Sequence, residues 1–121
     1  MSTDEILTIC MKRAPSTEEI EAYRGKLGVT VEEALNSIAL TLARRYDAGE
    51  MAFFDCDIAA NSLYSWCLLK RDHVLPEPAL SVFLAFDEGE YRHSGDADDV
   101  DTEAKYTRPM IKELLRGIDA V

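Results

Sequence analysis

Residues 30–49 carry the pattern that most restricts what this chain can fold into. Thr30 and Glu33 stand three residues apart, which is the spacing of a capping box at the N-terminus of a helix. Apolar side chains then recur every three or four residues, at Val31, Leu35, Ile38, Leu42 and Tyr46. This period places them on one face of an α-helix, and Gly49 supplies a left-handed stop just beyond it. The segment therefore predicts an amphipathic helix whose apolar face must be covered by other helices.

Similar signals recur along the rest of the chain. Ser16 and Glu19 form a second capping box, and residues 79–86 are apolar almost all round, as in the central helix of a bundle. A kink or a new helix start is expected near Thr107, because Pro109 removes a backbone donor and disfavours helical angles at Arg108. No segment alternates polar and apolar residues with a two-residue period. We therefore predict an all-α fold, a single domain over residues 1–121 with five or six antiparallel helices on short loops.

Two stretches that lie forty residues apart have nearly the same sequence. Residues 39–51 and 79–91 both run from an apolar helix into an aromatic residue, an aspartate, a glycine and a glutamate. In both copies we expect the aromatic residue, Tyr46 or Phe86, to pack inward and the glycine to reverse the chain. We expect the following glutamate to bind backbone donors at the reversal. The repeat predicts a duplicated helix-and-turn unit, and a duplicated functional site is the alternative.

Acidic side chains are concentrated in one segment. The net charge of the chain is −10, and residues 86–103 contribute −7 of it through eight acids and one arginine. This field repels nucleic acid and anionic lipid and attracts basic proteins, so we predict neither a nucleic-acid nor a membrane partner. No apolar run approaches the length of about 18 residues that a membrane span needs, and residues 1–5 do not resemble a signal peptide. Three cysteines are too few for a disulfide framework and favour the cytoplasm.

The predicted partner-binding surface is centred on one tyrosine surrounded by acids. Tyrosine is a good contact anchor, and nearby carboxylates speed the capture of a basic partner. The surface consists of Asp87, Glu88, Glu90, Tyr91, Asp96, Asp98, Asp99 and Asp101. It predicts a non-catalytic module that masks a basic protein surface and needs no cofactor.

The last third of the chain has a recognisable order of segments. An apolar helix ends in Phe86-Asp87-Glu88-Gly89-Glu90-Tyr91, an aspartate-rich loop follows, and the terminal helix contains Lys112-Glu113-Leu114-Leu115. This layout resembles the small acidic helical immunity proteins of bacteria, which neutralise cationic nuclease toxins. The resemblance implies an immunity or antitoxin-like action, in which the acidic surface covers a basic partner.

Two alternative functions come from other features of the sequence. Glu90 and His93 have the Glu-x-x-His spacing of di-iron helical bundles, and Glu50 is the equivalent acid of the first repeat copy. These three residues predict a metal-binding protein or a metal-dependent enzyme. The other alternative is a structural dimerisation domain whose acidic loop only keeps the protein soluble. We find no readable catalytic triad or phosphate loop, so we predict no catalytic residues and a chain that is a monomer or a homodimer.

Overall fold

The structure is a computed structural model, and it describes residues 1–120. Its α-helices are α1 (Thr3–Cys10), α2 (Thr17–Leu27), α3 (Val31–Asp47), α4 (Phe53–Arg71), α5 (Ala79–Glu88) and α6 (Arg108–Asp119). A π-helical turn, η1 (Glu103–Thr107), leads directly into α6. Residues 1–120 contain no strand, so the all-α prediction is confirmed. In this part of the chain, no helix combines the length and the apolarity that crossing a membrane requires.

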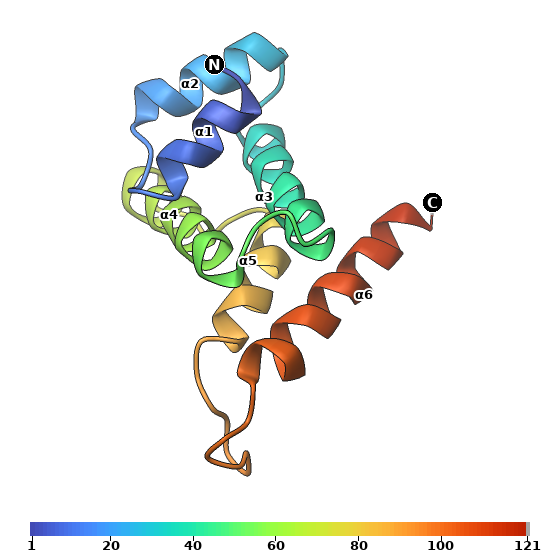
Figure 1. Ribbon diagram of the computed structural model, residues 1–121. Helices are drawn as coiled ribbons and strands as arrows, with labels where there is room; N and C mark the ends of the chain where they lie inside the picture. Colours follow the sequence, from blue (N-terminus) through green and yellow to red (C-terminus); the bar gives the residue numbers. More distant parts are fainter. Residues whose placement is uncertain (121) are drawn as a thin grey trace.

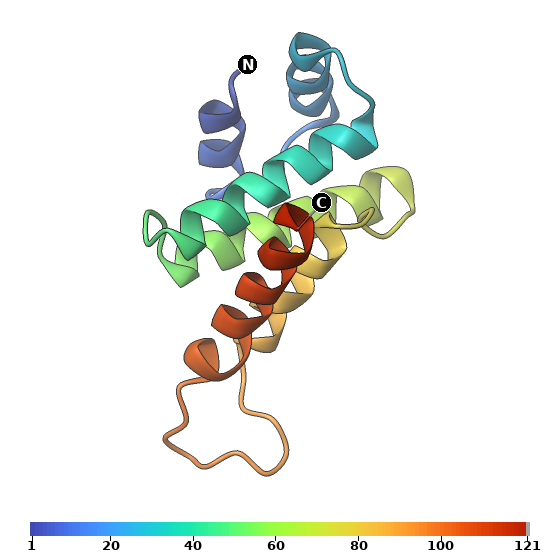
Figure 2. The same cartoon turned by 90° about the vertical axis from the view of Figure 1, so that its right-hand side faces the viewer.

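The helices lie in three tiers (Figure 1, Figure 2). α1 and α2 cover one end, α3 and α4 run side by side through the middle, and α5 and α6 form the other end. Figure 2 shows α3 with α4, and α5 with α6, as antiparallel neighbours. The segment between α5 and η1 projects from the last tier, away from α1 and α2.

Polar caps determine where the first three helices begin. Ser16 with Glu19, and Thr30 with Glu33, form the two predicted capping boxes at the starts of α2 and α3. In each box the hydroxyl accepts a hydrogen bond from a backbone N–H three residues on, and the glutamate accepts one in return. α1 begins with a third capping box at Ser2, which was not predicted. Loss of such a cap typically costs about 1 kcal/mol.

The apolar helix α5 lies at the centre of the core, as predicted. It packs against α3, α4, η1 and α6. Phe86 is fully buried and meets Tyr46 edge to face, with ring centroids 5.2 Å apart. The aromatic residues of the two repeat copies therefore pack inward, as predicted, and they pack against each other. One side chain of α5, Leu84, faces outward and is 41% exposed.

The two glycines of the repeat have different conformations. Gly49 follows α3 with a φ of 75°, which is the predicted left-handed stop. Gly89 also follows the last residue of its helix, α5, but with a φ of −83° it is right-handed, so the two glycines end their helices in different conformations. Close packing requires glycine at position 89, because a Cβ atom there would lie 2.0 Å from Oγ1 of Thr107 in η1. In the second copy, glycine lets η1 approach α5.

Candidate functional site

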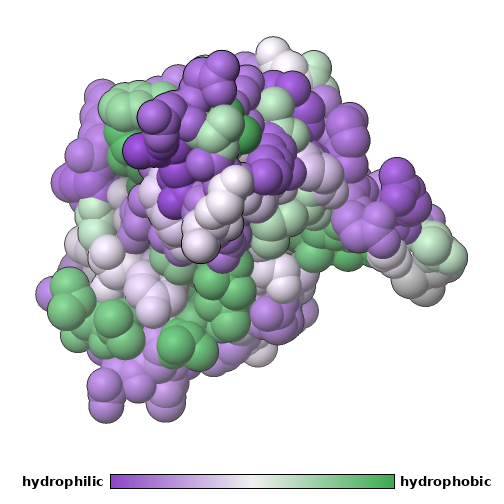
Figure 3. Space-filling model, turned by 90° about the horizontal axis from the view of Figure 1, so that it is seen from below, coloured by the Kyte–Doolittle hydropathy of each residue, from purple (hydrophilic) through white to green (hydrophobic). Residues whose placement is uncertain are grey.

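The predicted binding surface lies in and around residues 89–102, here called the acidic loop. The loop connects the C-terminus of α5 to η1, and Figure 2 shows it projecting beyond both α5 and α6. Seen from this end of the molecule, hydrophilic and apolar side chains occupy different parts of the surface (Figure 3). The contacts described below hold the loop in one shape.

The start of the acidic loop is part of the helix terminus of α5. The last four carbonyls of an α-helix lack donors within the helix, and in α5 each of them finds a donor nearby. Thr107 of η1 donates its hydroxyl to the carbonyl of Ala85 at 2.7 Å. His93 donates Nε2–H to the carbonyl of Glu88 at 2.9 Å, which fixes the tautomer of the imidazole. The two carbonyls between them accept from backbone N–H groups at the beginning of the loop at 3.1 Å.

Three aromatic rings form a stack that crosses the loop. The ring of Tyr91 lies on the imidazole of His93 with centroids 4.4 Å apart, and the imidazole lies 4.1 Å from the ring of Tyr106. Tyr91 is the outermost member and is 49% exposed. The ring of Tyr91, the predicted contact residue, is therefore held against the imidazole of His93 while about half of the residue stays exposed.

Asp96 lies inside the loop, with a side chain that is 1% exposed. Its carboxylate pairs with Lys105, accepts from the hydroxyl of Tyr106 at 2.6 Å and accepts from the backbone N–H of His93 at 2.9 Å. Lys105 first, then Tyr106 and the His93 amide, hold the pKa of this carboxyl well below its usual range. The carboxylate of Asp96 is therefore occupied in holding the aromatic stack.

The other acids of the predicted surface divide according to whether a cation already pairs with them. Asp98 pairs with the cation of Arg92, whereas Oε2 of Glu88 lies 2.9 Å from Nε2 of the His93 imidazole. Four acids of this surface form no ion pair with any of residues 1–120: Asp87, Glu90, Asp99 and Asp101. These four carry the charge that the loop does not neutralise itself, and all except the half-buried Asp87 are exposed.

Two residues of α4 that were not predicted to belong to the site lie beneath the start of the loop. The side-chain amide nitrogen of Asn61 lies 3.1 Å from Oε2 of Glu90 and 3.3 Å from Oδ1 of Asp57. Glu90 therefore meets a side-chain amide, and the expectation that it binds backbone donors is wrong. Burial, then a hydrogen bond to Glu90 and the charges of Glu90 and Asp87, raise the pKa of Asp57 to about 7. The sequence relates Asp57 to Asn61 by helical spacing alone, and nothing in it relates either to Glu90.

The three residues of the metal alternative do not meet. Glu50 is exposed in the turn between α3 and α4, where it lines a hollow together with Arg45. Glu90 binds Asn61, and His93 binds the end of α5. In residues 1–120, no three His, Cys, Asp or Glu side chains are arranged to hold a metal ion.

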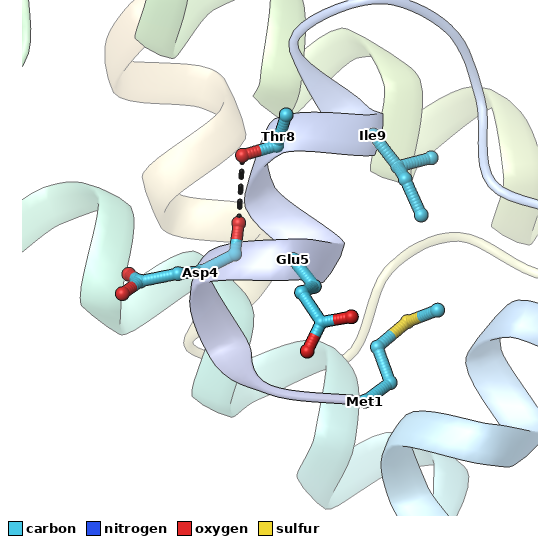
Figure 4. Close-up of a pocket in the computed structure, with 5 residues that line it drawn as sticks. All are labelled: Met1, Asp4, Glu5, Thr8 and Ile9. Carbon is cyan, nitrogen blue, oxygen red and sulfur yellow. Dashed lines mark hydrogen bonds between the residues drawn. The ribbon is translucent and has the colours of Figure 1, made fainter.

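One surface hollow of about 380 Å³ lies along α1 (Figure 4). Its lining residues are Met1, Asp4, Glu5, Thr8 and Ile9. Figure 4 shows the carboxylates of Asp4 and Glu5 pointing in different directions. Asp4 pairs with Arg45, while Glu5 accepts from the backbone N–H of Ser2 at 3.1 Å. The two carboxylates thus have separate structural roles and do not form an acid–base pair.

The other two hollows also offer little for chemistry. One of about 430 Å³ lies between α1 and the α3–α4 turn, and one of about 530 Å³ lies between α5 and α6, where Met110 and Leu114 line it. No histidine or cysteine lines any of these three hollows.

The cysteines are buried, and burial raises the pKa of Cys10 and of Cys56 to about 12. Their thiols are therefore protonated at neutral pH.

The fold and the site define a small helical bundle that displays an ordered acidic loop. Comparison of the chain with protein-family models, curated proteins and solved structures finds no match.

Proposed function

We propose that this chain is a non-catalytic protein-binding module whose acidic loop covers a basic surface on its partner. The observation that carries the proposal is the supported ring of Tyr91, half exposed among carboxylates that no cation of the described residues neutralises. An immobilised aromatic ring offers contact area without the entropic cost of ordering it on binding. Uncompensated carboxylates around it speed the encounter with a cationic surface.

The internal contacts of the loop support this proposal further. Ordering a residue costs roughly 1–2 kcal/mol of backbone entropy, so a loop that served only to keep the protein soluble would gain nothing from being fixed. Here Asp96, His93 and the aromatic stack fix it. The concrete version of the proposal is an immunity or antitoxin-like action, in which the partner is a basic toxin. It predicts a basic protein, encoded beside this chain, that binds it and dissociates at high salt.

The binding surface is tested with an oligoarginine peptide and fluorescence anisotropy at low and high salt. The Asp99→Asn/Asp101→Asn variant should weaken binding by about fivefold, because an exposed ion pair contributes up to about 1 kcal/mol. Tyr91→Ala should weaken it by about threefold through loss of cation–π contact. Glu18→Gln/Asp55→Asn is the matched control, since both acids are exposed and form no ion pair within residues 1–120.

Equal losses in the loop variant and in the control would show that only net charge matters, and they would overturn the proposed surface. A dimer that persists at high salt and does not bind the peptide would instead favour the structural dimerisation domain.

A further inference from the structure

Asp57 and Glu90 form a pair of carboxyl groups at the point where the acidic loop leaves α5. Asp57 belongs to α4 and is half-buried, and Glu90 follows the buried Gly89. The side-chain nitrogen of Asn61 lies between them, 3.3 Å from Oδ1 of Asp57 and 3.1 Å from Oε2 of Glu90, and it also donates to the backbone carbonyl of Asp57 at 2.8 Å. Two carboxylates around one amide nitrogen repel each other, and a proton on one of them turns the repulsion into a hydrogen bond.

The charged groups that face this pair come from α5 and from the loop. Asp87 of α5 contributes a third negative charge next to Asp57. His93 of the loop faces Asp87, and it is already paired with Glu88. No lysine, arginine or histidine of residues 1–120 forms an ion pair with Asp57, Asp87 or Glu90.

We propose that Asp57 and Glu90 form a proton-dependent latch that holds the start of the acidic loop on α4. In the closed latch, protonated Asp57 donates a hydrogen bond to Glu90, while the side-chain amide of Asn61 donates to Glu90 and to the backbone carbonyl of Asp57. When Asp57 loses its proton, three neighbouring carboxylates are left without a cation, and Glu90 moves away from α4. The latch therefore couples the pH to the position of the residue that precedes Tyr91.

The latch is closed at acidic pH and opens as the pH rises. Burial and the charges of Glu90 and Asp87 raise the pKa of Asp57 from 3.8 to about 7 in the folded chain. The closed form thus keeps a proton that the open form releases, and this advantage is lost as the pH rises through about 7. Because a single proton is released, the ratio of closed to open molecules can fall by at most about thirtyfold between about pH 5.5 and 8.5.

Hydrogen exchange at two amides of the isolated chain reports on the latch. The N–H groups of Gly89 and Glu90 donate to the carbonyls of Phe86 and Asp87, each at 3.1 Å. NMR gives the protection factor of each amide, which is the intrinsic exchange rate at a given pH divided by the observed rate, so the intrinsic effect of pH on exchange cancels. We expect both to fall by up to about thirtyfold between about pH 5.5 and 8.5, while protection in α3 stays constant.

Two substitutions separate the latch from other effects of pH. Asp57→Asn keeps a hydrogen-bond donor for Glu90 but cannot titrate, so protection should stay high at the upper pH. Glu90→Gln removes the repulsion, so the midpoint for Asp57 should move to lower pH.

Two control variants should keep the wild-type response. His73→Gln removes an exposed histidine in the turn after α4, a side chain of a type that titrates in the same range, and Asp99→Asn removes a loop charge that does not touch the pair. Protection that is constant in the wild type, or that falls equally in Asp57→Asn, would overturn the latch.

The effect of the latch on partner binding rests on the proposed function. Opening adds one negative charge and frees Glu90, so oligoarginine should bind more tightly at the upper pH to the wild type than to Asp57→Asn. Constant protection factors with intact peptide binding would refute the latch and leave the proposed function standing. Protection factors that fall as expected, in a chain that does not bind the peptide, would support the latch and refute the proposed function.

Discussion

Gly89→Ala introduces one methyl group where η1 packs against α5. The new Cβ atom would lie 2.0 Å from Oγ1 of Thr107 and 3.1 Å from the ring of Phe53. Thr107 is fully buried and has no free space, and its hydroxyl donates to the carbonyl of Ala85 at 2.7 Å. The methyl group therefore either displaces this hydroxyl from its acceptor or separates η1 from α5.

The magnitude follows from three contributions to the free energy of unfolding. Overpacking in a core costs about 1–3 kcal/mol. Loss of the buried hydrogen bond from Thr107 costs about 1–3 kcal/mol. Alanine restricts the unfolded chain and returns about 0.4–1 kcal/mol. Because the hydroxyl moves to relieve the clash, the two costs overlap, and we expect a net loss of about 2–4 kcal/mol. With an unfolding entropy of about 0.25 kcal/mol/K for 121 residues, the Tm should fall by about 8–16 °C.

Urea unfolding followed by circular dichroism measures this loss, and Gly117→Ala is the matched control. Gly117 lies in α6 with no atom within 4 Å of an added Cβ, so the control should stabilise the chain by about 0.5–1 kcal/mol. In a Thr107→Ala background, Gly89→Ala should lose less than half as much stability, because the clashing hydroxyl is gone. A loss below about 0.5 kcal/mol for Gly89→Ala, or the same loss in both backgrounds, would refute the reasoning.

Three further predictions concern the loop, the core and the thiols. Tyr46→Phe removes a hydroxyl that donates to Oε2 of Glu103 at 2.6 Å, so urea unfolding should show a loss of about 1–2 kcal/mol, and no change would contradict this contact. Asp96→Asn should raise amide exchange in the acidic loop by about tenfold or more while the unfolding midpoint hardly moves, because the loop opens locally. A thiol reagent at about pH 8 should not label Cys10 or Cys56 in the folded chain, whereas every thiol should react in denaturant; rapid native labelling would contradict their burial.

The features that were predictable from sequence depend on residues that are near neighbours in the chain. The capping box of Thr30 and Glu33 spans one helical turn, and the apolar stripe that ends at Tyr46 repeats every turn. Both are therefore visible in a short window. The capping box at Ser2 has the same spacing and was readable in the same way.

The features that were not predictable depend on contacts between distant segments. Thr107 leaves no room for a side chain at Gly89, and Glu90 accepts a hydrogen bond from Asn61 of α4. Gly49 and Gly89 therefore serve different purposes, a left-handed helix end at Gly49 and close packing of η1 at Gly89. The candidate site shows the same limit, because charge density marked the acidic loop but gave no sign that Asp96 would be buried.

Some acids of the acidic loop form ion pairs with cations of the described residues, and others form none. Asp96 and Asp98 each have a cationic partner within residues 1–120, whereas Asp99 and Asp101 have none. A segment that only solvates the protein gains nothing from internal pairing, because each pair reduces its net charge. Pairing is useful where a fixed shape matters, and here it supports the exposed ring of Tyr91. The ordered contacts and the unpaired acids together favour a binding surface over a solubilising tail.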